Sequence, residues 1–95
     1  MDINNILRIY LGTKNGGFDP IGQGEDRLKQ AFPRDWERML VAIEPYLGVD
    51  HRPDWSLHDL IEEGEIFAEI LRKRFPELDD ISVKALANRF TYGWK

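Results

Sequence analysis

Histidine and carboxylate side chains gather in one stretch of this 95-residue sequence, and these residue types can bind a metal ion. The residues are His51, Asp54, His58, Asp59 and Glu62. Zinc or manganese needs three or four ligands that converge on one point. His58 and Glu62, four residues apart, would share a helix face, but nothing in the pattern fixes the position of His51. We therefore expect polar surface beside a helix cap, and we predict no metal or other cofactor.

The sequence offers little for covalent catalysis. It contains no cysteine, and its serines, Ser56 and Ser82, both stand where helix caps are expected. Carboxylates are abundant but form no selective acid–base pair, because most of those after position 60 fall on the polar side of a long helix. We predict that the chain is not an enzyme.

Acidic residues are concentrated between positions 50 and 69, where Arg52 is the only Lys or Arg. The seven acids are Asp50, Asp54, Asp59, Glu62, Glu63, Glu65 and Glu69, so this stretch carries a net charge of −6 while the whole chain carries −4. A concentrated negative field steers a basic partner and raises its association rate. We predict a protein-binding or inhibitory module that binds a basic partner through Asp54, Trp55, Asp59, Glu62, Glu63 and Glu65, with Trp55 as an apolar anchor.

A nucleic-acid-associated regulator is the alternative hypothesis. The segment 82–90 resembles the opening helix of a helix-turn-helix unit, and Lys84, Arg89 and Lys95 could contact phosphates. The sequence ends before a recognition helix could follow, and the overall negative charge gives no general attraction to a phosphate backbone. We therefore favour the protein partner.

A glycine-rich segment at 12–24 separates the first two predicted helices. It holds five of the eight glycines but lacks the order of a phosphate-binding loop, because Thr13 precedes Lys14 and a helix precedes both. As a calcium loop it would place Pro20 where the turn glycine belongs. We predict a connecting loop that could also contribute a partner-binding surface.

Apolar residues recur at helical spacing through most of the chain. Asp2 is expected to cap a first helix that ends at Gly12, and Glu25 with Asp26 opens a short second helix. The third helix carries the stripe Trp36, Leu40, Ile43 and Leu47. Pro45 lies inside that stripe and removes a backbone donor, so we predict that the helix stops or kinks near Ile43 or Glu44.

A second loop is predicted at 48–55, followed by the longest helix at 56–75. Ser56 is the expected cap, in a capping-box-like arrangement with Asp59. Gly64 lies in the apolar stripe of this helix, which indicates the close approach of a neighbouring helix. Asp79 or Asp80 is expected to cap the last helix, and Gly93 to end it.

These patterns predict an all-α protein: one compact domain over residues 1–95, a bundle of four to five short helices. The hydrophobic fraction of 42% and charged fraction of 32% suit one modest core, without disulfides. The longest apolar run, at 39–43, is too short for a membrane span, and no signal peptide is recognisable. We expect a cytoplasmic protein, either a monomer or a homodimer formed through the aromatic tail at 90–94.

Overall fold

The computed structural model describes residues 1–13, 17–20 and 23–94. Over these residues the chain forms helices and no strand, which confirms the all-α prediction. The helices are α1 (Ile3–Leu11), α2 (Gly24–Ala31), α3 (Trp36–Leu47), α4 (Leu60–Arg74) and α5 (Asp80–Tyr92). No helix of the described part is long and apolar enough to cross a membrane.

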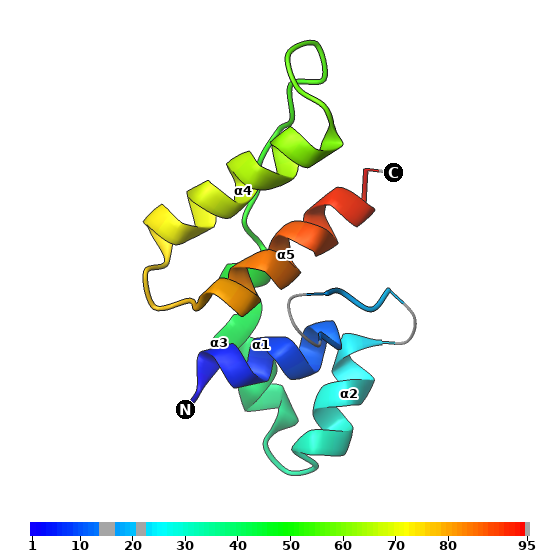
Figure 1. The fold of residues 1–95 in the computed structure, drawn as a ribbon. Coiled ribbons are helices and arrows are strands. Elements are labelled where there is room, and N and C mark those ends of the chain that lie inside the picture. Colours follow the sequence, from blue (N-terminus) through cyan, green and yellow to red (C-terminus); the bar gives the residue numbers. More distant parts are fainter. Residues whose placement is uncertain (14–16, 21–22, 95) are drawn as a thin grey trace.

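Helix α1 lies at the centre of the arrangement. It packs against α2 and α3 on one side and against α5 on the other, and α4 packs along α5 (Figure 1). The molecule is elongated, with extents of 46 × 28 × 22 Å. As a result α4 forms an outer edge of the molecule and leaves much of its own surface exposed.

The hydrophobic core runs through all five helices. The side chains with no exposed surface, or almost none, include Leu7 and Leu11 of α1, Leu28 of α2, Ile43 of α3, Leu71 of α4 and Val83 of α5. Because every helix contributes at least one of them, burial of apolar area stabilises the helices jointly.

Side-chain caps fix the ends of α1 and α5, largely as predicted. The Asp2 carboxylate accepts a hydrogen bond from the Asn5 backbone N–H, and Gly12 ends α1 in the left-handed conformation at φ 63°. Asp79 caps α5 by accepting from the Ser82 N–H. The Arg8 side chain also forms an ion pair with Asp79, which ties α1 to the start of α5.

The predicted stop near Ile43 or Glu44 was wrong: α3 continues through Pro45 and ends at Leu47. Pro45 removes the hydrogen bond that would reach the Val41 carbonyl. Both residues lie on the exposed side of α3, so water can solvate that carbonyl, and the buried stripe keeps the last turn in place.

The predicted start of the longest helix was also wrong. Asp59, not Ser56, caps α4: its carboxylate accepts from the Glu62 N–H, and the Glu62 carboxylate accepts from the Asp59 N–H, a reciprocal capping box. The second loop therefore extends from Gly48 to the cap at Asp59. The close approach predicted at Gly64 is confirmed, because a Cβ there would lie 2.9 Å from Cγ2 of Thr91 in α5.

The described parts of the glycine-rich segment pack against the helices. The Asp19 N–H donates to the Leu11 carbonyl at 3.0 Å, and the Phe18 ring meets Tyr92 of α5 edge-on, with centroids 5.8 Å apart. Residues 14–16 and 21–22, over which the loop was also predicted, lie outside the described residues.

Gly24 supplies a test of the packing between α1 and α2. A Cβ at this position would lie 2.5 Å from the ring of Tyr10, which is closer than atoms can approach. Although alanine is the better helix former, we expect Gly24→Ala to lower the free energy of unfolding by about 1–3 kcal/mol through overpacking. Urea denaturation provides the measurement.

Gly48→Ala is the matched control, because the nearest atom to a Cβ there is a backbone oxygen at 3.4 Å and the φ of −93° suits any residue. We expect that variant to change stability by less than about 1 kcal/mol. Equal stability of the two variants would contradict the described contact between Gly24 and Tyr10.

Candidate functional site

The segment between α3 and α4, residues 48–59, is folded back onto the first turns of α4; we call it the connector. A tight turn at Asp54 shapes it. The Asp54 carboxylate accepts from the Ser56 N–H at 3.0 Å and from the Ser56 hydroxyl at 2.5 Å, and the Asp54 carbonyl accepts from the His58 N–H. These hydrogen bonds from Ser56 lower the pKa of Asp54 below its usual value.

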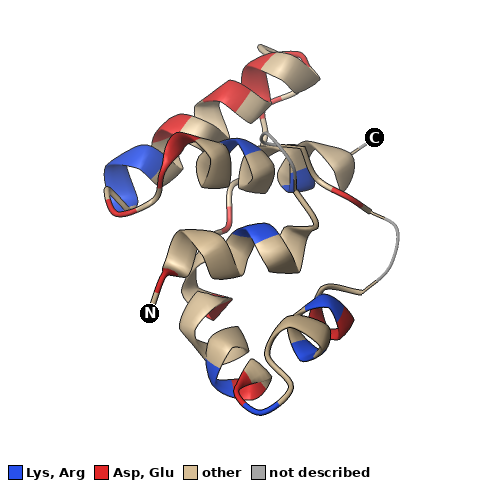
Figure 2. Cartoon of the chain, turned by 60° about the horizontal axis from the view of Figure 1, so that its bottom comes forward, with Lys and Arg blue, Asp and Glu red and all other residues tan. Residues whose placement is uncertain are grey.

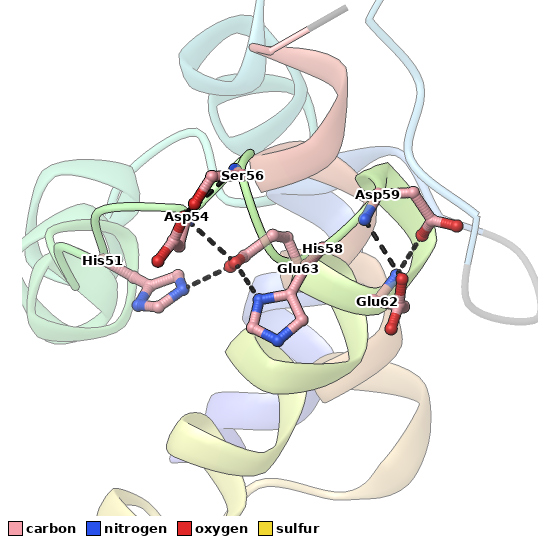
Figure 3. A network of polar contacts seen from close by, with 7 residues as sticks. All are labelled: His51, Asp54, Ser56, His58, Asp59, Glu62 and Glu63. Carbon is pink, nitrogen blue, oxygen red and sulfur yellow. Dashed lines mark hydrogen bonds and ion pairs between the residues drawn. The ribbon is translucent and has the colours of Figure 1, made fainter.

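Glu63 is the centre of a buried polar network that joins the connector to α4 (Figure 3). Its side chain is only 2% exposed. One carboxylate oxygen accepts from the Asp54 backbone N–H at 2.9 Å and lies 2.9 Å from Nδ1 of His58. The other lies 2.7 Å from Nε2 of His51. Two side chains and one backbone group of the connector therefore meet at one carboxylate.

The network holds Glu63 in its ionised form. The Asp54 N–H, the His51 side chain and the His58 side chain stabilise the carboxylate against the opposing effect of burial, and they lower the pKa of Glu63 from 4.5 to about 2. Because an ionised carboxylate only accepts hydrogen bonds, His51 must donate from Nε2 and His58 from Nδ1.

The prediction that Glu63 belongs to the exposed acidic surface was therefore wrong. Glu63 lies four residues before Phe67 and eight before Leu71, so it continues the buried stripe of α4. That spacing was present in the sequence. What it could not show was that the connector would bring three donors to a carboxylate on this side of the helix.

Aromatic rings extend the network toward the end of α5. The His51 ring packs near Phe90, with centroids 5.6 Å apart, and Phe90 stacks on Phe67 at 4.4 Å. Trp94 lies 6.5 Å from Phe90 and meets Trp55 at 5.7 Å. Trp55 thus contacts Trp94 of the C-terminal end and remains 45% exposed, as an interface anchor would be.

The possible metal ligands do not converge in the way a metal site requires. His51 and His58 both contact Glu63, whereas Asp59 and Glu62 form the capping box. Within residues 1–13, 17–20 and 23–94, no group of three or more histidine and carboxylate side chains could hold a metal ion. The histidines are explained by their hydrogen bonds to Glu63.

Apolar and acidic side chains remain exposed together at the start of α4. Leu57 is 70% exposed and Ile61 is 73% exposed, and the exposed acids beside them in sequence are Asp59, Glu62 and Glu65. None of these three acids forms an ion pair with another described residue. We call these five residues the acidic face. Figure 2 shows acidic residues along α4 and basic residues gathered at its far end.

A groove of about 640 Å³ lies between α4 and α5, and Gly17 of the glycine-rich segment also lines it. It shares Ile61 and Glu65 with the acidic face. Its lining includes Ile61 and Glu65 near the start of α4, the small residues Gly64, Ala68 and Ala87 along its length, and Lys84. Arg72 lines it at the far end of α4.

Lys84 and Arg89, the described residues on which the nucleic-acid hypothesis depends, already have partners, as does Arg72 of α4. Arg72 and Lys84 both form ion pairs with Asp80, at 2.9 Å and 3.0 Å, and Arg89 donates to the Leu47 carbonyl. Lys95 lies outside the described residues. This arrangement gives less support to the nucleic-acid hypothesis than to an acidic docking surface.

The depressed pKa of Glu63 predicts a specific loss of stability in acid. Its contribution is fully present above pH 4.5 and is lost as the pH falls from 4.5 toward about 2, because folding then requires a carboxylate that the unfolded chain holds protonated. We expect Glu63→Gln to be less stable than the wild type at pH 7 and to lose less of its remaining stability over this acid range.

Urea midpoints measured at several pH values test this, with the exposed Glu65→Gln as control. That control should follow the wild-type pH dependence closely. A Glu63→Gln variant whose pH dependence equals that of the wild type would show that the network does not hold the carboxylate ionised.

The same network fixes the histidine tautomers. At pH 8 we expect ¹⁵N NMR to show the proton of His51 on Nε2 and that of His58 on Nδ1, since both nitrogens face Glu63. A His58 that carries its proton on Nε2 would contradict this hydrogen bond.

Comparison of the chain with protein-family models, with curated proteins and with solved structures gives no match. The function of the protein is therefore inferred from its own surface: a connector locked by Glu63, an acidic face that is left exposed, and the adjoining groove.

Proposed function

We propose that the protein is a small interaction or inhibitory module that binds a basic surface of another protein through its acidic face. The observation that carries the proposal is the exposure of Leu57 and Ile61 beside acids that have no cationic partner among the described residues. Exposed aliphatic side chains surrounded by one sign of charge are typical of a binding surface.

The acids of this molecule fall into two groups, and the contrast supports the proposal. Asp80 at the start of α5 is neutralised by Arg72 and Lys84, and Glu69 lies 3.9 Å from Arg72. Glu62 and Glu65 form no ion pair within the part of the chain that the structure describes, so their field extends into solvent. A negative field of this kind raises the association rate of a basic partner, by 10-fold or more at low salt.

The connector prepares this surface for binding. Glu63 holds Asp54 and the two histidines in place, and the turn at Asp54 leads directly to Trp55 and Leu57. Less conformational entropy is lost on binding when the surface is ordered beforehand. In this proposal Asp54 and Glu63 are positioning residues, while Trp55, Asp59, Glu62 and Glu65 contact the partner.

A double variant tests the acidic face without damage to the α4 cap. Glu62→Gln keeps a side-chain oxygen for the capping box, and Glu65→Lys reverses an exposed charge. In pull-downs from nuclease-treated cell extract at low and moderate salt, we expect basic proteins captured by the wild type to be lost, or weakened at least tenfold, with this variant.

The matched control is Glu37→Gln with Glu44→Lys on α3, which changes the net charge equally at exposed positions. It should retain the captured proteins, and circular dichroism should show all variants folded. If the control variant loses the captured proteins equally, overall charge rather than the acidic face explains their capture. If capture requires nucleic acid, the alternative function of a nucleic-acid-associated regulator is favoured.

A further inference from the structure

The groove between α4 and α5 has the dimensions of a binding site for one helix. Its α4 wall runs from Leu60 to Arg72, which corresponds to about 18 Å or three helical turns. Its α5 wall is formed by Lys84, Ala87, Asn88 and Thr91, which span about 10 Å or two helical turns, and Gly17 of the glycine-rich segment also lines it. Two helices that leave a groove of this length can receive a third along it.

The bottom of the groove is lined by small side chains. Gly64 and Ala68 of α4 and Ala87 of α5 are nearly buried, yet they leave space above them, while Ile61 stands exposed at the edge. Large apolar side chains of an incoming helix would fit between these small residues, and Ile61 would be covered. An occupant of this shape buries apolar area on both partners.

Charge along the groove is uneven, and this selects the occupant. Glu65 lines one end and forms no ion pair with another described residue, and the same holds for Glu62, which follows Ile61 in the sequence but does not line the groove. Arg72 and Lys84 at the other end share the single carboxylate of Asp80. A second copy of this chain that met the groove with the same face would bring a groove rather than a ridge. A convex occupant with free positive charge at one end fits better.

We propose that the groove binds an amphipathic helix of the partner, about three turns long. Its apolar residues, spaced i, i+4 and i+7, face Gly64, Ala68 and Ala87, and its Lys or Arg residues lie at the end beside Glu62 and Glu65. This inference rests on the proposed function and specifies the secondary structure and charge of the bound segment.

Fluorescence anisotropy with synthetic peptides tests the proposal. The probe is an amphipathic peptide of about 14 residues, with leucines at i, i+4 and i+7 spacing and lysines confined to one end. Two comparison peptides have the same composition, one with the leucine spacing scrambled and one with the lysines spread along its length. A third carries a central proline that breaks the helix. We expect the probe to bind at least tenfold more tightly than all three.

One protein variant separates the groove from the acidic face: Asn88→Trp fills the groove from α5 and leaves every residue of the acidic face unchanged. Ile61→Ser removes an exposed apolar side chain that the groove and the acidic face share. Val41→Ser on α3, where Val41 is 64% exposed, is the control for Ile61→Ser. We expect Asn88→Trp to weaken probe binding at least tenfold, Ile61→Ser to weaken it several-fold, and Val41→Ser to have no effect.

Each result has a distinct meaning. Weakening by Asn88→Trp and by the Glu62/Glu65 variant together supports the helix in the groove. If only the Glu62/Glu65 variant weakens peptide binding, or if the proline peptide binds as tightly as the probe, the proposal of a helix in the groove is overturned. The proposed function of the acidic face is not affected by either result. If both Asn88→Trp and the Glu62/Glu65 variant still capture basic proteins as the wild type does, the groove proposal and the acidic-face function are both overturned. A concentration-dependent dimer in analytical ultracentrifugation that Asn88→Trp abolishes would identify a second copy as the occupant and overturn the inference.

Discussion

The buried carboxylate of Glu63 is the interaction on which the outer part of this structure depends. A charged group with almost no exposure is tolerated only when donors surround it, and here all three come from the connector. Removal of Glu63 would leave two histidines and a backbone N–H without their acceptor. The route of the chain from α3 to α4, and the direction in which α4 begins, are therefore set by one side chain.

Neighbouring residues of α4 serve opposite purposes because of where the helix places them. Glu62 closes the capping box and faces solvent, Glu63 is buried in the network, and Glu65 is exposed beside the groove. Successive residues of a helix point about 100° apart, so one short acidic run can both anchor a loop and charge a surface. The concentration of acid in this region thus reflects two requirements rather than one.

The sequence predicted the parts of the fold that depend on local chemistry. Helical spacing of apolar residues predicted four to five helices, and the described chain has five. Asp2, Gly12 and Gly64 were assigned their observed roles. The errors arose where contacts with a distant segment determine the end of a helix or the partner of a side chain. Pro45 stays inside α3, where the partly buried Tyr46 and Leu47 that follow it pack against the core. Ser56 serves the Asp54 turn, and Asp59 with Glu62 forms the cap of α4. The partners of Glu63 come from a loop whose path no local pattern specifies.

The contact between the two ends of the described chain has a consequence for synthesis. Asn4 and Arg8 of α1 bind the start of α5 through Asp79, and α1 lies between α5 and the helices α2 and α3. During translation the first helices emerge with one side of α1 still uncovered, because α5, which covers it, is made after the other four described helices. Residues 79–92 must leave the ribosome before the core of the described chain can close, so we expect this core to form late relative to the synthesis of α1.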